Sequence, residues 1–160
     1  MKKTMRLALL LLAVVSLTPI KAQNMEKVDV KEIYNELKEC GVFYLATVDG
    51  DQPRVRPFGA LAVYEGRLYL QTGKVKNVYR QLAANGKFEL CGMKSMTEWV
   101  RVSGRLVLDD RLEAKQWMLD QNPGLKRMYS ADDDNTAVLY IEDGVATFSS
   151  FVSEPRTVSF

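Results

Sequence analysis

The chain has 160 residues, a length typical of one domain that buries its own core without disulfide bonds. It contains 22 basic and 20 acidic residues and no histidine. The lack of histidine excludes Ser-His-Asp and Cys-His catalysis and HExxH zinc sites, so an enzyme of this composition would rely on a cofactor for its chemistry.

The first 22 residues have the pattern of a secretory signal peptide. Three basic residues between Lys2 and Arg6 precede the uncharged apolar run Leu7–Leu17, and Ala22 offers a small residue at the cleavage point. The run is too short to span a membrane as a helix. We therefore expect residues 1–22 to be removed, leaving a periplasmic or secreted protein without a stable membrane anchor. The alternative is a cytoplasmic protein whose translation starts at Met25.

Removal of this segment changes the charge balance. Residues 1–22 hold four of the 22 basic residues and no acidic one, which leaves 18 basic against 20 acidic residues and a net charge of −2. A slightly acidic chain has no general attraction for nucleic acid, so we expect no nucleic-acid partner and treat basic clusters as local features. Residues 23–160 are expected to form one domain.

The remaining chain alternates short strands with helical segments. Apolar residues at helical spacing predict a helix over residues 28–40, which Asp29 can cap and Gly41 can end. Further helices are predicted over residues 75–84 and 111–120. Strands are predicted over residues 42–48, 53–64, 67–72, 87–93, 99–108, 137–141 and 145–151. The turn signal Glu142-Asp143-Gly144 predicts a hairpin between the last two.

This order of elements predicts the fold class. Antiparallel strands joined by short turns, with helices in the gaps, indicate a mainly β (α+β) protein, a small six-stranded antiparallel barrel with flanking helices. Cys40 and Cys91 are the only cysteines. A disulfide is one reading for an exported protein, but neither residue belongs to a CxxC motif and we favour two buried free thiols.

Four basic side chains lie at the two ends of a predicted hairpin. They are Arg54, Arg56, Lys74 and Lys76. The arginines are two residues apart on one strand, so they point to the same side and repel each other unless an anion lies between them. The lysines flank a helix N-terminus, where free N–H groups and the helix dipole favour an anion. Thr72 and Asn77 add a hydroxyl and an amide.

This arrangement predicts a phosphate site, with a solvated hairpin edge as the alternative. The sequence contains neither a Walker A loop nor a GxGxxG motif after a strand. The acidic stretch Asp132–Asp134 lacks the glycine of an EF-hand and is interpreted as a solvated loop, so we expect no metal site.

Three stretches resemble one known family: FYLATVDGDQPRVRPFG from Phe43, EGRLYLQTGKVKN from Glu65 and WVRVSGRL from Trp99. Residues 33–160 are similar to the pyridoxamine 5'-phosphate oxidase-like flavoproteins, in particular their small nitroimidazole-resistance and general-stress branch. The resemblance implies a split β-barrel that binds FMN at a homodimer interface. It also implies an oxidoreductase acting on a small molecule, such as a nitro or quinone-like compound. The alternative is a non-catalytic protein that binds flavin, haem or deazaflavin.

The resemblance also implies roles for individual residues. The strand beside the flavin ring and reaching toward the phosphate would comprise Arg54, Val55, Arg56 and Pro57. The strand end beneath the ring would be Gln71 and Thr72. Phosphate and ribityl contacts would come from Lys74, Lys76 and Asn77. The partner subunit would contribute Trp99 and Arg101.

Two features of the family are missing. The chain ends at Phe160 without the Arg-x-His substrate motif of pyridoxamine phosphate oxidases, so vitamin B6 oxidation is not implied. The histidine that often lies near the flavin in the nitroimidazole-resistance branch is missing too. No catalytic residue is assigned.

Overall fold

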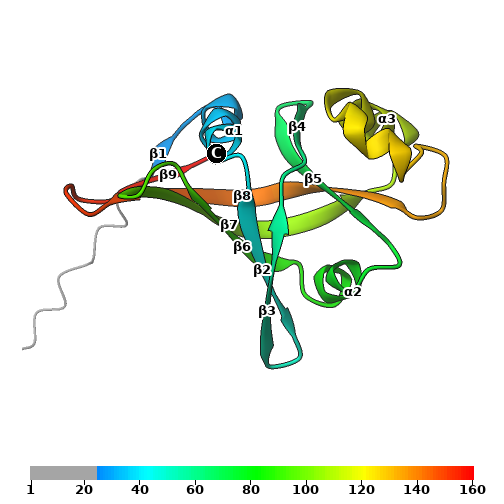
Figure 1. The fold of residues 1–160 in the computed structure, drawn as a ribbon, viewed down its shortest axis with the longest axis horizontal. Helices are drawn as coiled ribbons and strands as arrows, with labels where there is room; N and C mark the ends of the chain where they lie inside the picture. The colour runs from blue at the N-terminus through cyan, green and yellow to red at the C-terminus, as the bar shows by residue number, and fades with distance from the viewer. Residues whose placement is uncertain (1–24) are drawn as a thin grey trace, which may run out of the picture.

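The computed structural model describes residues 25–160, which form one large sheet with three α-helices packed around it (Figure 1). The predicted signal peptide lies outside the described residues. Within them, no helix is both long and apolar enough to cross a membrane.

The helices are α1 (Val30–Glu39), α2 (Asn77–Ala84) and α3 (Leu112–Gln121), followed by the 3-10 helix η1 (Pro123–Arg127). The strands are β1 (Glu26–Lys27), β2 (Phe43–Asp49), β3 (Gln52–Phe58), β4 (Leu61–Tyr64), β5 (Arg67–Gly73), β6 (Lys87–Met93), β7 (Glu98–Asp109), β8 (Thr136–Ser150) and β9 (Arg156–Ser159). Asp29 caps α1 as predicted, accepting a hydrogen bond from the backbone N–H of Lys31.

The strands form an unclosed, split barrel. Their order is β1-β9-β8-β7-β6-β2-β3, and the β4–β5 hairpin joins through pairing of β5 with β8. Every pair is antiparallel except the short β1–β9 pair. The predicted class, a mainly β split barrel with flanking helices, is confirmed. The short strands β1 and β9 were not predicted, because two to four residues carry too little periodicity to identify.

Two predicted boundaries are wrong. The strand predicted over residues 53–64 is interrupted at Gly59-Ala60, so that β3 pairs with β2 while β4 pairs with β5. The hairpin predicted at Glu142-Asp143-Gly144 does not form. These three residues instead lie inside the single strand β8. The register against β7 shifts there, and Asp143 has a positive φ of 52°. The sequence Asp143-Gly144, which is typical of a turn, therefore forms a β-bulge. A β-bulge, like a tight turn, often needs a residue with a positive φ.

The buried apolar residues form two clusters on opposite faces of β5. Leu68 and Leu70 belong to the main core, which α1 and α2 cover, whereas Tyr69 points to the other face. There Tyr69 packs with Met118 of α3. Alternating residues of one strand thereby support α2 on one side of the sheet and α3 on the other, as Figure 1 shows.

Both cysteines are free thiols, as favoured from the sequence, but they are half-buried and not fully buried as predicted. Burial is the main cause that raises the pKa of Cys40 and of Cys91.

Candidate functional site

Arg56 links three elements. It lies on β3 opposite Leu45 of β2. Its Nη1 donates to the carbonyl oxygen of Leu45 at 3.1 Å and to Oγ1 of Thr47 at 2.7 Å. Its Nη2 donates to Oε1 of Gln81 in α2 at 2.7 Å. These three bonds use three of the five guanidinium N–H groups, so two remain for a ligand.

The same Gln81 oxygen also accepts a hydrogen bond from the Thr47 hydroxyl at 2.8 Å. Gln81 and Thr47 are both buried. Burial, with a smaller contribution from the neighbouring charge of Arg54, lowers the pKa of Arg56, but a guanidinium stays protonated at neutral pH. A partly buried cation is thus held at the surface of α2.

The N-terminus of α2 offers a second set of donors to an anion. Lys76 is the N-cap residue and makes no side-chain hydrogen bond to the helix. The first N–H groups of a helix have no intrahelical acceptor, and the helix dipole favours negative charge there. Gln81, the contact of Arg56 in α2, lies four residues after Asn77, which is about one helical turn, roughly 6 Å along the helix axis, from this terminus.

A small pocket of about 150 Å³ adjoins the start of α2. Asn77, Arg80, Gln81 and Ala84 line it from the helix, and residues 48–50 complete it. The Asn77 side chain accepts a hydrogen bond from the Arg80 guanidinium. Lys76 forms no ion pair with any residue between 25 and 160, and its Nζ lies 5.7 Å from the ring centroid of Tyr129.

The other two cations of the predicted site are held by carboxylates. Arg54 lies 3.5 Å from Asp49 in the adjacent turn. Lys74 lies 3.1 Å from Asp110, which also binds Lys115 at 2.8 Å. The structure therefore joins Arg56 to the middle of α2 through Gln81 and leaves Lys76 at the start of the same helix, and the ion pairs of Arg54 and Lys74 lead to different carboxylates.

The strand end at Gln71 and Thr72 borders the split in the barrel. Strand β4 pairs with β5 only as far as Leu70, whereas β8 pairs with β5 through Gly73. Backbone groups of residues 71–73 that point away from β8 therefore lie at the opening. The side-chain amide of Gln71 and the hydroxyl of Thr72 are buried without a hydrogen-bond partner among the described residues. Because buried polar groups normally have partners, this strand end has unused hydrogen-bonding capacity.

Trp99 and Arg101 lie elsewhere in the sheet. Both are on β7, where the Trp99 ring lies 5.2 Å from that of Phe151 and Arg101 pairs with Glu89 at 2.7 Å. Strand β7 is three positions from β3 in the sheet, about 14 Å at 4.8 Å per strand. Within one chain, these residues therefore do not lie next to Arg56.

An exposed apolar surface covers the outer face of β3, β2, β6 and β7. Strand pairing places Tyr44 opposite Pro57 and Cys91, Val55 opposite Ala46, and Met93 opposite Trp99. Val55 is 64% exposed and Tyr44 is 53% exposed. We call this surface, defined by Tyr44, Val55, Pro57, Met93 and Trp99, the outer sheet face.

Sequence reasoning missed Thr47, Arg80 and Gln81. One signal was available for Gln81: it lies between Val78 and Leu82 on the apolar side of a predicted helix, a buried position that a glutamine occupies only with hydrogen-bond partners. No group of three or more His, Cys, Asp or Glu residues in the described part of the chain could hold a metal ion.

Comparison with known proteins gives a consistent set of matches. The family model described as pyridoxamine 5'-phosphate oxidase matches residues 30–158. A solved structure of a NimC/NimA family protein from Clostridium acetobutylicum is 48% identical, with a TM-score of 0.79, over 82% of this chain and 92% of that one. No curated protein matches the sequence.

Two more distant structures share the fold. A pyridoxamine 5'-phosphate oxidase-related, FMN-binding protein from Nostoc punctiforme is 16% identical, with a TM-score of 0.52, over 82% of this chain and 96% of that one. A haem-binding protein from Mycobacterium smegmatis is 14% identical, with a TM-score of 0.58, over 78% of this chain and 57% of that one.

Replacing Gln81 by Ala removes the acceptor shared by Thr47 and Arg56. We expect a loss of about 1–3 kcal/mol in the free energy of unfolding, because buried polar groups lose their partner. Urea denaturation measures it. The matched control, Gln121→Ala at the exposed end of α3, should cost less than about 0.5 kcal/mol. Equal losses in the two variants would show that the shared hydrogen bonds contribute nothing.

Proposed function

The chain belongs to the pyridoxamine 5'-phosphate oxidase family, and from this premise we propose that it is a flavoprotein that binds FMN. The observation that carries the proposal is the hydrogen bond from Arg56 to Gln81, which holds a guanidinium with spare donors against α2, the helix whose N-terminus has no side-chain cap. A phosphate monoester is negatively charged and has several acceptor oxygens, so it can neutralise these cations and accept hydrogen bonds from their free N–H groups.

Residues of the candidate site fit FMN in two respects. Arg56 and Lys76 would neutralise the phosphate, and the first N–H groups of α2 would donate to it. Backbone groups near Arg54 and at the unpaired edge of β5 near Gln71 would contact the ring. The buried, unpartnered side chains of Gln71 and Thr72 support a role for this strand end in binding.

FMN, when bound, supplies hydride or single-electron transfer. The chain contributes binding, orientation and electrostatics, and it has no histidine to move a proton. We propose an oxidoreductase that acts on a small acceptor such as a nitro or quinone-like compound. Turnover of the flavin-loaded protein with a reductant and a panel of acceptors tests this, and no turnover with any acceptor would favour a non-catalytic flavin carrier.

Haem is the second candidate ligand, because a distant structural relative is described as haem-binding. Without histidine, an axial ligand would have to be Tyr, Met or Cys. Burial raises the pKa of both cysteine thiols, which disfavours the thiolate form. The absorption spectrum of the purified protein separates the two ligands: flavin bands support the proposal, and a Soret band overturns it.

Replacing Arg56 and Lys76 together by Ala should weaken FMN binding by about 3–6 kcal/mol, because each charged hydrogen bond contributes about 1.5–3 kcal/mol. Titration of the apoprotein with FMN, followed by flavin fluorescence, measures the affinity. The control variant replaces Lys31 and Arg127, two exposed cations on α1 and η1, by Ala and should bind FMN as the unchanged protein does. Unchanged affinity in the Arg56 and Lys76 variant would mean that the phosphate binds elsewhere.

We further propose a homodimer that forms through the outer sheet face. The apolar residues of this face are exposed in the single chain, and a second copy packed on it would cover them and contribute Trp99 and Arg101, as the family resemblance implies. Tyr44→Glu should raise the dimer dissociation constant about 30-fold or more, equal to about 2 kcal/mol. Sedimentation equilibrium measures it. Leu112→Glu, an equally exposed apolar position on α3, should leave association unchanged; the reverse pattern would place the interface at α3.

We also propose that residues 1–22 are a signal peptide removed on export. N-terminal sequencing of the protein from fractionated cells should find a chain that begins at Gln23 in the periplasmic or extracellular fraction, because the charged start and apolar run direct secretion. An intact chain, or one that begins at Met25 in the cytoplasm, would contradict export.

A further inference from the structure

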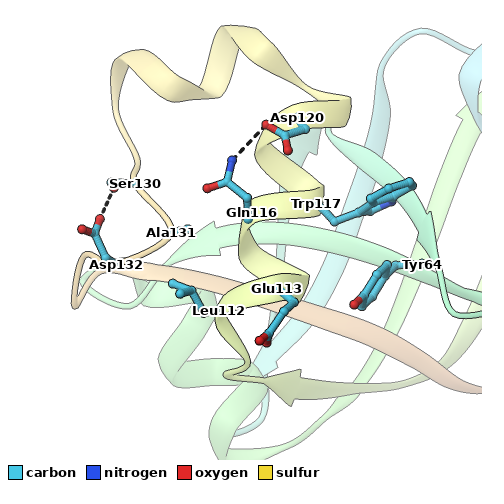
Figure 2. Close-up of a pocket in the computed structure, with 9 residues that line it drawn as sticks. All are labelled: Tyr64, Leu112, Glu113, Gln116, Trp117, Asp120, Ser130, Ala131 and Asp132. Carbon is cyan, nitrogen blue, oxygen red and sulfur yellow. Dashed lines mark hydrogen bonds between the residues drawn. The ribbon is translucent and has the colours of Figure 1, made fainter.

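A pocket of about 620 Å³ lies over the solvent side of α3, away from the proposed flavin site (Figure 2). Five residues from the exposed face of α3 form its floor, and β4 and the loop after η1 supply the rest. The lining residues are Tyr64, Leu112, Glu113, Gln116, Trp117, Asp120, Ser130, Ala131 and Asp132. This volume is in the range of small-molecule sites in proteins.

One end of the pocket is a fixed aromatic wall. The indole Nε1 of Trp117 donates to the carbonyl oxygen of Val63 at 2.8 Å, which holds the ring in place. The Tyr64 ring lies 5.7 Å from it, tilted by 34°, and Figure 2 shows the two side chains next to each other. The Arg111 guanidinium lies 5.6 Å from the centre of the Tyr64 ring, so within the chain a cation already contacts Tyr64, while Trp117 has no such contact among the described residues.

The polar lining is acidic. Three carboxylates, Glu113, Asp120 and Asp132, face the pocket, and no lining residue is basic. Lys126 binds Asp120 at 2.7 Å and offsets one charge. Asp132 accepts only a neutral hydroxyl, that of Ser130, and Glu113 forms no ion pair within residues 25–160. The carboxylates of Glu113 and Asp132 therefore have no basic partner among the described residues.

Packing of the core does not account for the apolar part of this lining. Ala114, Met118 and Leu119 form the buried side of α3. Leu112 is 55% exposed and Trp117 is 41% exposed on the opposite side, where a surface helix normally carries polar residues. Apolar and aromatic surface combined with excess negative charge is complementary to an organic cation and unfavourable to an anion such as FMN.

We propose that this pocket binds a small organic cation, an arylalkylammonium or a quaternary ammonium compound. The cationic group lies against Trp117 and Tyr64 near Glu113, and Asp132 adds negative charge at the other end of the pocket (Figure 2). Because α2 and α3 lie on opposite faces of β5, this site is separate from the phosphate site and does not depend on flavin binding.

The probe is benzyltrimethylammonium, titrated into the purified full-length protein by isothermal calorimetry. A probe of this size should bind with a dissociation constant on the order of 1 mM. Benzyl alcohol, which is neutral, and benzenesulfonate, which is anionic, should bind at least about tenfold more weakly. The absorption spectrum of the same sample reports flavin content, so failure of the FMN proposal is detected separately.

The charge requirement is tested with exposed carboxylates, whose replacement leaves the core intact. Glu113→Gln combined with Asp132→Asn should weaken binding of the cation about tenfold. The control Asp134→Asn removes a carboxylate from the same loop but outside the pocket and should change binding less than about twofold.

Three results would overturn the proposal: no binding of the cation at tens of times the expected dissociation constant, equal binding of the cation and benzyl alcohol, or an equal loss in the pocket and control variants. Self-association that Leu112→Glu abolishes would also overturn it, because a second copy would then cover the pocket.

Discussion

The pairing of β8 with three other strands holds the two halves of this fold together. Strand β8 pairs with β7 along most of its length, with β5 near its start and with β9 near its end. The pairing of β7 with β8 contains a β-bulge, where the register shifts between Ser103 and Arg105. A bulge bends the strand and increases its twist, so a strand of this length can follow the curvature of the sheet. Because β5 joins the sheet only through β8 and β4, its far end, residues 71–73, lies open at the split of the barrel.

The elements packed on the two faces of β5 differ in the charge of their exposed side chains. On one side, α2 carries Lys76 at its N-terminus and contacts Arg56 through Gln81, so two cations are associated with this helix. On the other side, α3 presents aromatic and acidic side chains, which suit a cation. Asp110 stands between these regions, since it binds both Lys74 and the buried Lys115. Opposite charge on opposite faces would let one small domain bind the two proposed ligands without mutual competition.

Part of the candidate site could be predicted from the sequence. Alternation placed Arg54 and Arg56 on the same face of one strand, and the helix start at Lys76 followed from local composition. The ion pair of Arg54 with Asp49 is local, between consecutive strands. The ion pair of Lys74 with Asp110 could not be predicted, because Asp110 is 36 residues from Lys74 in the chain. The role of Gln81 was hidden for the same reason: its partners Thr47 and Arg56 lie on other elements.

The sequence by itself determined the family, the mainly β class, the helix positions within about two residues and the absence of histidine chemistry. These follow from local periodicity, composition and the order of three characteristic stretches. Tertiary structure alone decided that β8 passes through a turn signal, that only Arg56 and Lys76 of four cations remain available at α2, and that α3 carries a pocket of its own. The physical reason is that hydrogen bonds and ion pairs join residues far apart in the chain, so their partners exist only once the sheet has assembled.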